Sequence, residues 1–174
     1  MELRRSRKRV NAPKFIKTSD YGLYFAYGSN LNIVQMADRC PTAVPHEVAT
    51  LHGYELQFRT YATVEAKKAT QTQGALYWIT SEDEDTLDAC EGAGFIYDKH
   101  LVKVTLANGK DVWALAYITI PSARPIAPPP AEYVECIEQG YRDWKITVDK
   151  PLPRPIPHNP TIHNRKRSRS TIHG

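Results

Sequence analysis

A glycine flanked by polar side chains is the first place in this sequence where chemistry is expected. Tyr27-Gly28-Ser29-Asn30 follows the apolar run at residues 23–26. Gly28 allows the backbone to approach a ligand closely, and the amides after it can converge on a carboxylate or a phosphate. The same composition is also typical of a tight turn that binds nothing. On these residues alone, an anion-binding bend and a plain turn are both open interpretations.

Glu91 is the second candidate, because it stands between a predicted helix and the glycines Gly92 and Gly94. If this carboxylate faces a cleft, partial burial would raise its pKa towards the range that suits a general base. The alternative is a helix-end glutamate that is exposed to water or paired with Lys99, since glutamates are usually surface residues.

Tyrosines are the third group of candidates, because the chain contains ten of them. A tyrosine offers an apolar ring with a polar tip, which suits the wall of a pocket as well as the core. Tyr97, Tyr133 and Tyr141 follow Glu91 in the chain. The three cysteines are far apart and form no C-x-x-C pair, and the histidines lack metal-binding spacing, so neither a disulfide framework nor a metal site is expected.

Short strands dominate the elements that must position these residues. Hydrophobic runs and turn residues predict strands at 23–27, 48–51, 54–58, 62–64, 74–79, 101–106 and 112–118. Residues 65–73 are polar and predict a loop or hairpin, and Asn108-Gly109 is a strong hairpin signal. Helices are predicted at 32–37, from Thr80 or Ser81 to Gly92, and at 131–141. Strands joined by short turns favour a mixed or antiparallel sheet, with a barrel as one closed form.

Charge divides the 174-residue chain into three parts. Residues 1–17 carry a formal charge of +6, residues 18–150 carry −7, and residues 151–174 carry +5. We therefore expect a basic flexible leader at 1–20, a folded domain at 21–150, and a proline-rich then basic tail at 151–174 without packed structure. No apolar run is long enough to cross a membrane, and no signal-peptide segment follows the basic start, so a cytoplasmic protein is the simplest expectation.

Several motifs, taken in order, resemble the γ-glutamylcyclotransferase-like family. The first is residues 23–31, which end in Tyr-Gly-Ser-Asn-Leu. The others are Arg39-Cys40-Pro41-Thr42-Ala43, residues 49–58, Gly74-Ala75-Leu76-Tyr77, Leu87-Asp88-Ala89-Cys90-Glu91-Gly92, and Pro129-Pro130-Ala131-Glu132-Tyr133. The likeness runs from about Leu23 to Trp144, and the ordered set is more specific than any single motif.

This resemblance implies an α+β fold, namely a small mixed β-barrel with flanking helices. It also implies a reaction in which the α-amine of a small γ-glutamyl substrate attacks its own γ-carbonyl, which releases 5-oxoproline without a cofactor or a metal. Glu91 is implied to be the general acid/base. The substrate-binding residues implied by the family are Tyr27, Gly28, Ser29, Asn30, Leu31, Tyr97 and Tyr133. The amides of residues 28–31 would hold the α-carboxylate or the developing oxyanion.

The resemblance leaves the substrate open among γ-glutamyl amino acids, γ-glutamyl amines and a γ-glutamyl protecting group used in antibiotic synthesis. The Tyr-Gly-Ser-Asn-Leu motif favours the first or the third. A rival interpretation is a binding protein of the same fold that captures an acidic small molecule without turning it over, while its basic ends contact nucleic acid or an acidic partner. The oligomeric state does not follow from the sequence.

Overall fold

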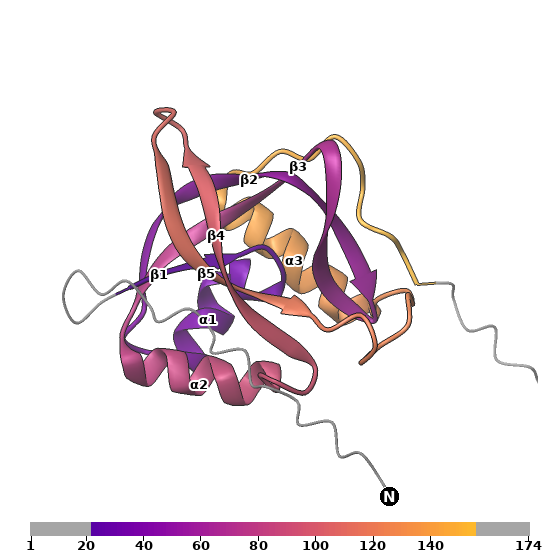
Figure 1. The fold of residues 1–174 in the computed structure, drawn as a ribbon, viewed down its shortest axis with the longest axis horizontal. Helices are drawn as coiled ribbons and strands as arrows, with labels where there is room; N and C mark the ends of the chain where they lie inside the picture. The colour runs from indigo at the N-terminus through magenta and orange to yellow at the C-terminus, as the bar shows by residue number, and fades with distance from the viewer. Residues whose placement is uncertain (1–21, 156–174) are drawn as a thin grey trace, which may run out of the picture.

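Five strands form a closed barrel in the computed structural model, which describes residues 22–155 (Figure 1). The strand order around the barrel is β1-β3-β2-β4-β5. Neighbouring strands are antiparallel except β1 and β5, which close the barrel through a parallel pairing of Tyr24 with Leu115. With helices packed around the barrel, the predicted α+β fold with a small mixed β-barrel is confirmed.

The first strand leads directly into the glycine bend. Strand β1 (Gly22–Ala26) lies along β3, and its apolar side chains are buried, as the run of large hydrophobic residues predicts. A single 3-10 turn η1 (Ser29–Leu31) follows, and helix α1 (Ile33–Arg39) begins after Asn32. The Asn32 side chain accepts a hydrogen bond from the Gln35 amide, which is a typical N-cap. The predicted strand and short helix are therefore both present.

Two long strands replace four shorter ones that the sequence predicts. Strand β2 (Val44–Arg59) and strand β3 (Tyr61–Ile79) form a hairpin that turns at Thr60. The expectation of a hairpin or loop at 65–73 is wrong, because these residues belong to β3. Residues 65–66 and 71–73 pair with β2, and residues 67–70 between them bulge out without a paired residue on β2. The register slips between His52 and Tyr54, where Gly53 has a φ of +78°. A bulge therefore accommodates the irregularity that looked like a break between strands.

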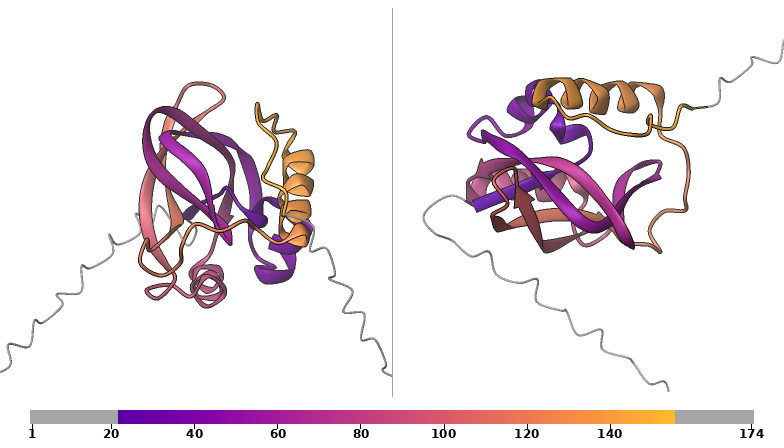
Figure 2. Two further views of the ribbon diagram at one scale, coloured as in Figure 1. Left: turned by 90° about the vertical axis from the view of Figure 1, so that its right-hand side faces the viewer. Right: turned by 90° about the horizontal axis from the view of Figure 1, so that it is seen from above.

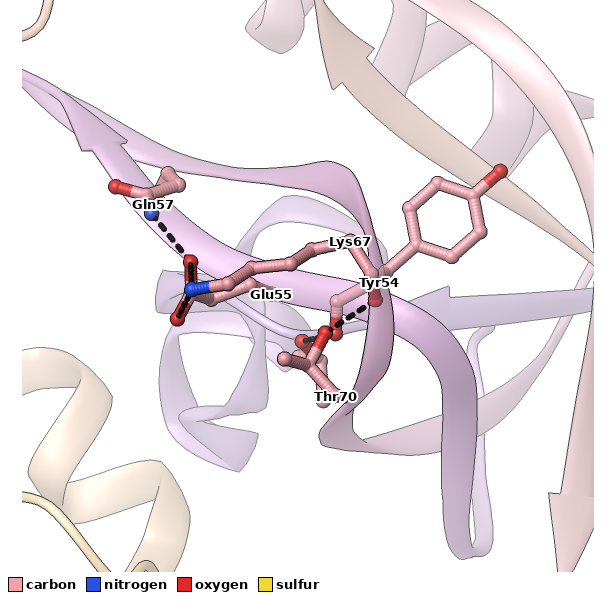
Figure 3. A network of polar contacts seen from close by, with 6 residues as sticks. Tyr54, Glu55, Gln57, Lys67 and Thr70 are labelled. Carbon is pink, nitrogen blue, oxygen red and sulfur yellow. Dashed lines mark hydrogen bonds and ion pairs between the residues drawn. The ribbon is translucent and has the colours of Figure 1, made fainter.

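Polar side chains explain how residues 65–73 can lie in a strand. The ammonium group of Lys67 contacts both carboxylate oxygens of Glu55 on β2 at 2.9 Å, and Gln57 donates to the same carboxylate at 2.8 Å (Figure 3). The Thr72 hydroxyl donates to the Tyr54 carbonyl at 3.0 Å. Cross-strand partners of this kind stabilise a strand with few apolar residues, because strand preference depends on neighbours more than on composition.

Helix α2 (Ser81–Glu91) has well-defined ends that position Glu91. Thr80 and Asp83 form a capping box at its start, and Gly92 adopts the left-handed conformation after its last residue, with a φ of +61°. The chain then turns into strand β4 (Tyr97–Leu106), which pairs with strand β5 (Asp111–Thr119) through the hairpin at Asn108-Gly109. These predicted boundaries are confirmed within a few residues.

Helix α3 (Ala131–Trp144) packs against one side of the barrel, beside η1 (Figure 2). It extends one turn beyond the predicted end at Tyr141. Gly140 allows close contact, because a side chain there would place its first carbon 2.6 Å from the carbonyl carbon of Leu31 and 2.8 Å from the Asn32 amide nitrogen. The Trp144 indole donates to the Leu31 carbonyl at 2.9 Å. Helix α3 therefore holds the segment that carries the glycine bend.

The domain boundary expected at residue 150 stays a prediction, but packing continues past it. Leu152 is 7% exposed and belongs to the hydrophobic core, and Arg154 forms an ion pair with Glu138 at 2.8 Å. The expectation of no packed structure from Pro151 onward is therefore wrong at these residues. The predicted leader at 1–20 and the rest of the tail lie outside the described residues. Within residues 22–155, no helix is both long enough and apolar enough to span a membrane.

Candidate active site

One cavity of about 310 Å³ brings together seven of the eight site residues predicted from the sequence. The predicted residues that line it are Tyr27, Gly28, Ser29, Asn30, Glu91, Tyr97 and Tyr133. They come from the end of β1, from η1, from the end of α2, from the start of β4 and from α3. Residues that are far apart in the chain therefore share one small space, which is how binding sites are commonly built.

The glycine bend is tightly enclosed, and this enclosure requires Gly28. A side chain at Gly28 would place its first carbon 3.0 Å from the Tyr133 hydroxyl and 3.2 Å from the Ala62 methyl group. The amides of Gly28, Ser29 and Asn30 donate to no backbone carbonyl among residues 22–155. The Ser29 amide lies within hydrogen-bonding reach of the Tyr133 hydroxyl and helps to lower its pKa against the larger effect of burial. The amides of Gly28 and Asn30 are therefore the part of the predicted cradle that is left for an anion.

Leu31 is the predicted site residue that the structure does not place in the cavity. Its side chain is fully buried at 0% exposure, and a side chain at Gly140 of α3 would collide with it. Its amide donates to the Gly28 carbonyl at 3.0 Å, so this N–H group is already used inside the 3-10 turn. The prediction that Leu31 contacts the substrate through its amide is therefore wrong. Its role is to anchor the bend to the core.

Asn30 connects the bend to the candidate catalytic glutamate. Its side-chain nitrogen Nδ2 donates to the Tyr24 hydroxyl at 3.0 Å and lies 3.4 Å from a carboxylate oxygen of Glu91. Its side-chain oxygen accepts from Arg39 at 2.8 Å and from Gln35 at 3.3 Å. Asn30 is only 3% exposed. Its side chain is therefore committed to this buried network and orients the groups around it.

Glu91 has the environment that a general base requires. It is half-buried in the cavity wall, and desolvation raises its pKa above the ordinary glutamate value, while the positive charge of Arg39 partly opposes that rise. Its ion-pair partners do not include Lys99, which contacts Glu84 and Asp88. Both alternatives, a Glu91 exposed to water and a Glu91 paired with Lys99, are therefore excluded by its position.

Ala62 at the start of β3 fixes two cavity tyrosines in opposite ways. Its carbonyl accepts a hydrogen bond from the Tyr97 hydroxyl at 3.1 Å, whereas its amide donates to the Tyr133 hydroxyl at 3.0 Å. The Tyr97 proton is therefore used, and the Tyr133 proton remains free to be donated. Burial raises the pKa of Tyr97 to about 12 and raises the pKa of Tyr133 as well, so both hydroxyls stay protonated at neutral pH.

Tyr27 is the third tyrosine that the sequence placed in the site. Its ring forms part of the wall, and its hydroxyl donates to the backbone carbonyl of Tyr117 on β5. Burial raises its pKa well above the ordinary tyrosine value. Tyr27 therefore shapes the cavity and joins the end of β1 to β5.

Two cations line the cavity that were not predicted as site residues. They are Arg39 at the end of α1 and Arg124 in the proline-rich connector. Neither forms an ion pair with a carboxylate of residues 22–155. A basic residue that stands alone in a proline-rich connector is a signal that would have singled out Arg124. Further lining residues that were not predicted are Tyr24, Gln35, Tyr61, Ala62, Cys90, Ile96 and Tyr117.

The cavity therefore offers one carboxylate of raised pKa, two guanidinium groups and two backbone amides. These groups suit a ligand with an ammonium group and at least one carboxylate. Across residues 22–155, no group of three or more His, Cys, Asp or Glu side chains is arranged to hold a metal ion.

Comparison with known proteins identifies the family of this chain. Residues 24–145 match the model of the family described as gamma-glutamyl cyclotransferase, AIG2-like. The chain is 28% identical to mouse gamma-glutamylcyclotransferase over 134 residues, which cover 70% of each protein. It is 28% identical to the human protein of the same name over 140 residues, which cover 73% of each.

A solved structure of a gamma-glutamyl cyclotransferase has the same fold. It superposes with a TM-score of 0.68 at 27% identity, covering 72% of this chain and 81% of that one. The family match spans most of the chain and includes every residue that lines the cavity. The chain therefore belongs to the gamma-glutamyl cyclotransferase, AIG2-like family and is an enzyme of that type.

Proposed function

We propose that this protein releases 5-oxoproline from a small γ-glutamyl compound, with Glu91 as the general acid/base. The observation that carries the proposal is the position of the Glu91 carboxyl group. It is half-buried, lies within 3.4 Å of Asn30, and faces the same cavity as the amides of the glycine bend. A γ-glutamyl group held at the bend would therefore have its α-amine near a base.

The reaction requires two protons to leave the α-amine nitrogen. The α-amine arrives as an ammonium ion and must lose the first proton before its nitrogen can attack the γ-carbonyl carbon. Glu91 accepts that proton, and a bond forms between the amine nitrogen and the carbonyl carbon. The attacking nitrogen then loses its second proton to solvent, which leaves the single hydrogen of the lactam. When the original amide C–N bond breaks, Glu91 returns the first proton to the leaving nitrogen, and the released amine takes up the second proton from solvent. No group is oxidised or reduced, and the products are 5-oxoproline and a free amine or amino acid.

The remaining groups of the cavity position the substrate and stabilise charge. The amides of Gly28 and Asn30 are suited to the α-carboxylate or to the oxyanion that forms at the carbonyl. The unused Tyr133 proton provides a further donor beside Gly28. Holding amine and carbonyl at attack distance supplies much of the acceleration in a reaction that closes a ring.

The test is a screen of γ-glutamyl dipeptides and γ-glutamyl amines for release of 5-oxoproline. We expect the wild type to turn over at least one class, and we expect Glu91→Gln to lower kcat by about 10²–10⁴-fold. Glu82→Gln is the matched control, because it makes the same change at an exposed position of the same helix. Ligand-induced thermal stabilisation without product from any substrate would instead support a binding protein.

A further inference from the structure

We propose that Arg124 binds a carboxylate on the leaving group of the substrate, so that γ-glutamyl amino acids are preferred over γ-glutamyl amines. This inference rests on the proposed function for the name of the ligand. It rests on the structure for the cation, for the way in which that cation is held, and for its place in the cavity.

Arg124 is held in place at the cavity wall by several contacts. Its guanidinium carbon lies 5.2 Å from the centre of the Tyr61 ring, and Tyr61 packs edge-on against Tyr133 with ring centres 5.0 Å apart. Its own backbone carbonyl accepts a hydrogen bond from Arg59 at 2.8 Å. A guanidinium group that is stacked and tethered in this way loses little further freedom when it binds a ligand.

The backbone around Arg124 is fixed to the tip of the β2–β3 hairpin. The Thr60 amide donates to the Ala127 carbonyl at 3.0 Å, and the Ala127 amide donates to the Phe58 carbonyl at 3.3 Å. These bonds join the connector to the hairpin as a short parallel bridge. The backbone that follows Arg124 is therefore fixed to the hairpin by main-chain contacts at Ala127.

Arg124 retains hydrogen-bonding capacity that the protein does not use. Its Nε atom is buried and has no hydrogen-bond partner among residues 22–155. Because Nε is closed off from the cavity, a ligand can reach only the two terminal nitrogens of the guanidinium group. These form no ion pair with residues 22–155 and can bind a carboxylate through two parallel bonds. A carboxylate on the ligand is therefore the partner that fits this group.

The two arginines of the cavity act on different neighbours, which separates two parts of the site. Arg39 contacts Asn30, and its charge influences the pKa of Glu91. Arg124 lies over Tyr61, and its charge influences the pKa of Tyr97. On this proposal, the glutamyl group lies at the bend beside Glu91 and the leaving group lies towards Tyr61 and Arg124.

The net charge of the cavity wall also favours γ-glutamyl amino acids over γ-glutamyl amines. The charged residues that line the cavity are Arg39, Arg124 and Glu91, so the wall carries one excess positive charge when Glu91 is ionised. A γ-glutamyl amino acid has two carboxylates and one ammonium group, and its single net negative charge balances the wall. A γ-glutamyl amine is neutral overall and leaves the excess charge uncompensated.

Binding measurements on a Glu91→Gln background test the proposal, because this variant leaves the ligand intact. The probes are γ-glutamyl-alanine and the same compound with its terminal carboxylate converted to an amide. Isothermal titration calorimetry should show the acid bound about 10–100-fold more tightly than the amide. Adding Arg124→Gln should abolish that preference, and Arg124→Lys should retain part of it because the charge remains without the planar fork.

Lys68→Gln provides the control, because it removes one positive charge from an exposed position outside the cavity and should leave the preference unchanged. Equal binding of acid and amide, a preference that persists in Arg124→Gln, or no binding of the acid would each overturn the proposal. Wild-type turnover decides the proposed function separately. If the acid is preferred but no 5-oxoproline forms, the enzymatic proposal fails and the role of Arg124 stands. Release of 5-oxoproline at equal kcat/KM from both compounds would give the reverse result.

Discussion

The two sides of the cavity hold their polar side chains in different ways. On the side of η1 and α1, Asn30 uses its side-chain nitrogen and oxygen in contacts with Tyr24, Glu91, Arg39 and Gln35. On the side of the hairpin tip and the connector, the Nε atom of Arg124 has no partner among the described residues. The Asn30 side chain is fully used within the protein, whereas the Arg124 side chain keeps capacity for a ligand.

We therefore expect the two sides to serve different functions: one orients Glu91, and the other selects the leaving group. A reaction that is common to all γ-glutamyl substrates requires the same orientation of Glu91 each time, and a buried, fully bonded network provides it. Selection among leaving groups requires a group that interacts only when the right ligand is present. Variants that separate stability from substrate preference can therefore test the comparison.

The largest expected effect on stability is that of Asn30→Ala. We expect the free energy of unfolding to fall by about 2–3 kcal/mol, because the Tyr24 hydroxyl and Arg39 each lose a partner in a buried network. Urea denaturation followed by circular dichroism measures this change.

Arg124→Gln supplies the contrast for that measurement. We expect it to change the free energy of unfolding by less than about 1 kcal/mol, because its main loss is one cation–π contact with Tyr61. If the two variants cost the same stability, then the two sides of the cavity do not differ in the way described.

A loss of stability between those of Asn30→Ala and Arg124→Gln is expected for Gly140→Ala, which tests how α3 supports the bend at η1. Alanine favours helices over glycine by about 1 kcal/mol, so an uncrowded position would gain stability. Here the new methyl group would collide with Leu31 and with the backbone that leads into α1, and a net loss of about 1–3 kcal/mol is expected. A rise in the thermal midpoint would contradict the close packing of α3 on the bend.

The smallest change in stability is expected for Glu91→Gln, and its size depends on pH. Because burial raises the pKa of Glu91 in the folded state, the folded protein binds this proton more readily than the unfolded chain. The ionised carboxylate therefore lowers stability above the folded-state pKa, and this cost disappears below the unfolded-state pKa.

Differential scanning fluorimetry at several pH values should follow that pattern. Glu91→Gln should melt above the wild type at pH 7.5, and the two should converge as the pH falls to about 4, near the unfolded-state pKa of glutamate. The exposed control Glu82→Gln should show no such pH-dependent gain. A variant that melts below the wild type at pH 7.5 would show that the carboxylate stabilises the fold.

Local signals in the sequence determined much of this architecture. The apolar run before Gly28, the Thr80 cap, the glycine after Glu91 and the hairpin at Asn108-Gly109 all predict elements that the structure contains. These signals act within a few residues, through capping bonds and allowed backbone angles, so they can be recognised without the rest of the chain. The ordered motifs also indicated the family and the candidate residue Glu91.

The merging of residues 61–79 into one strand depended on tertiary structure. A polar segment joins a strand when the partner strand supplies matching side chains, as Glu55 does for Lys67. The burial of Leu31 also depended on tertiary structure, because helix α3, about 100 residues later in the chain, covers it.

Only the closed barrel decided which polar groups remain free in the site. Tyr97 and Tyr133 are the same residue type, yet the carbonyl of Ala62 uses the proton of one while its amide leaves the proton of the other available. Arg124 likewise reaches the cavity because main-chain bonds from the connector to Phe58 and Thr60 hold it there. Such contacts depend on where the barrel brings distant backbone groups, and short-range patterns in the sequence do not carry that information.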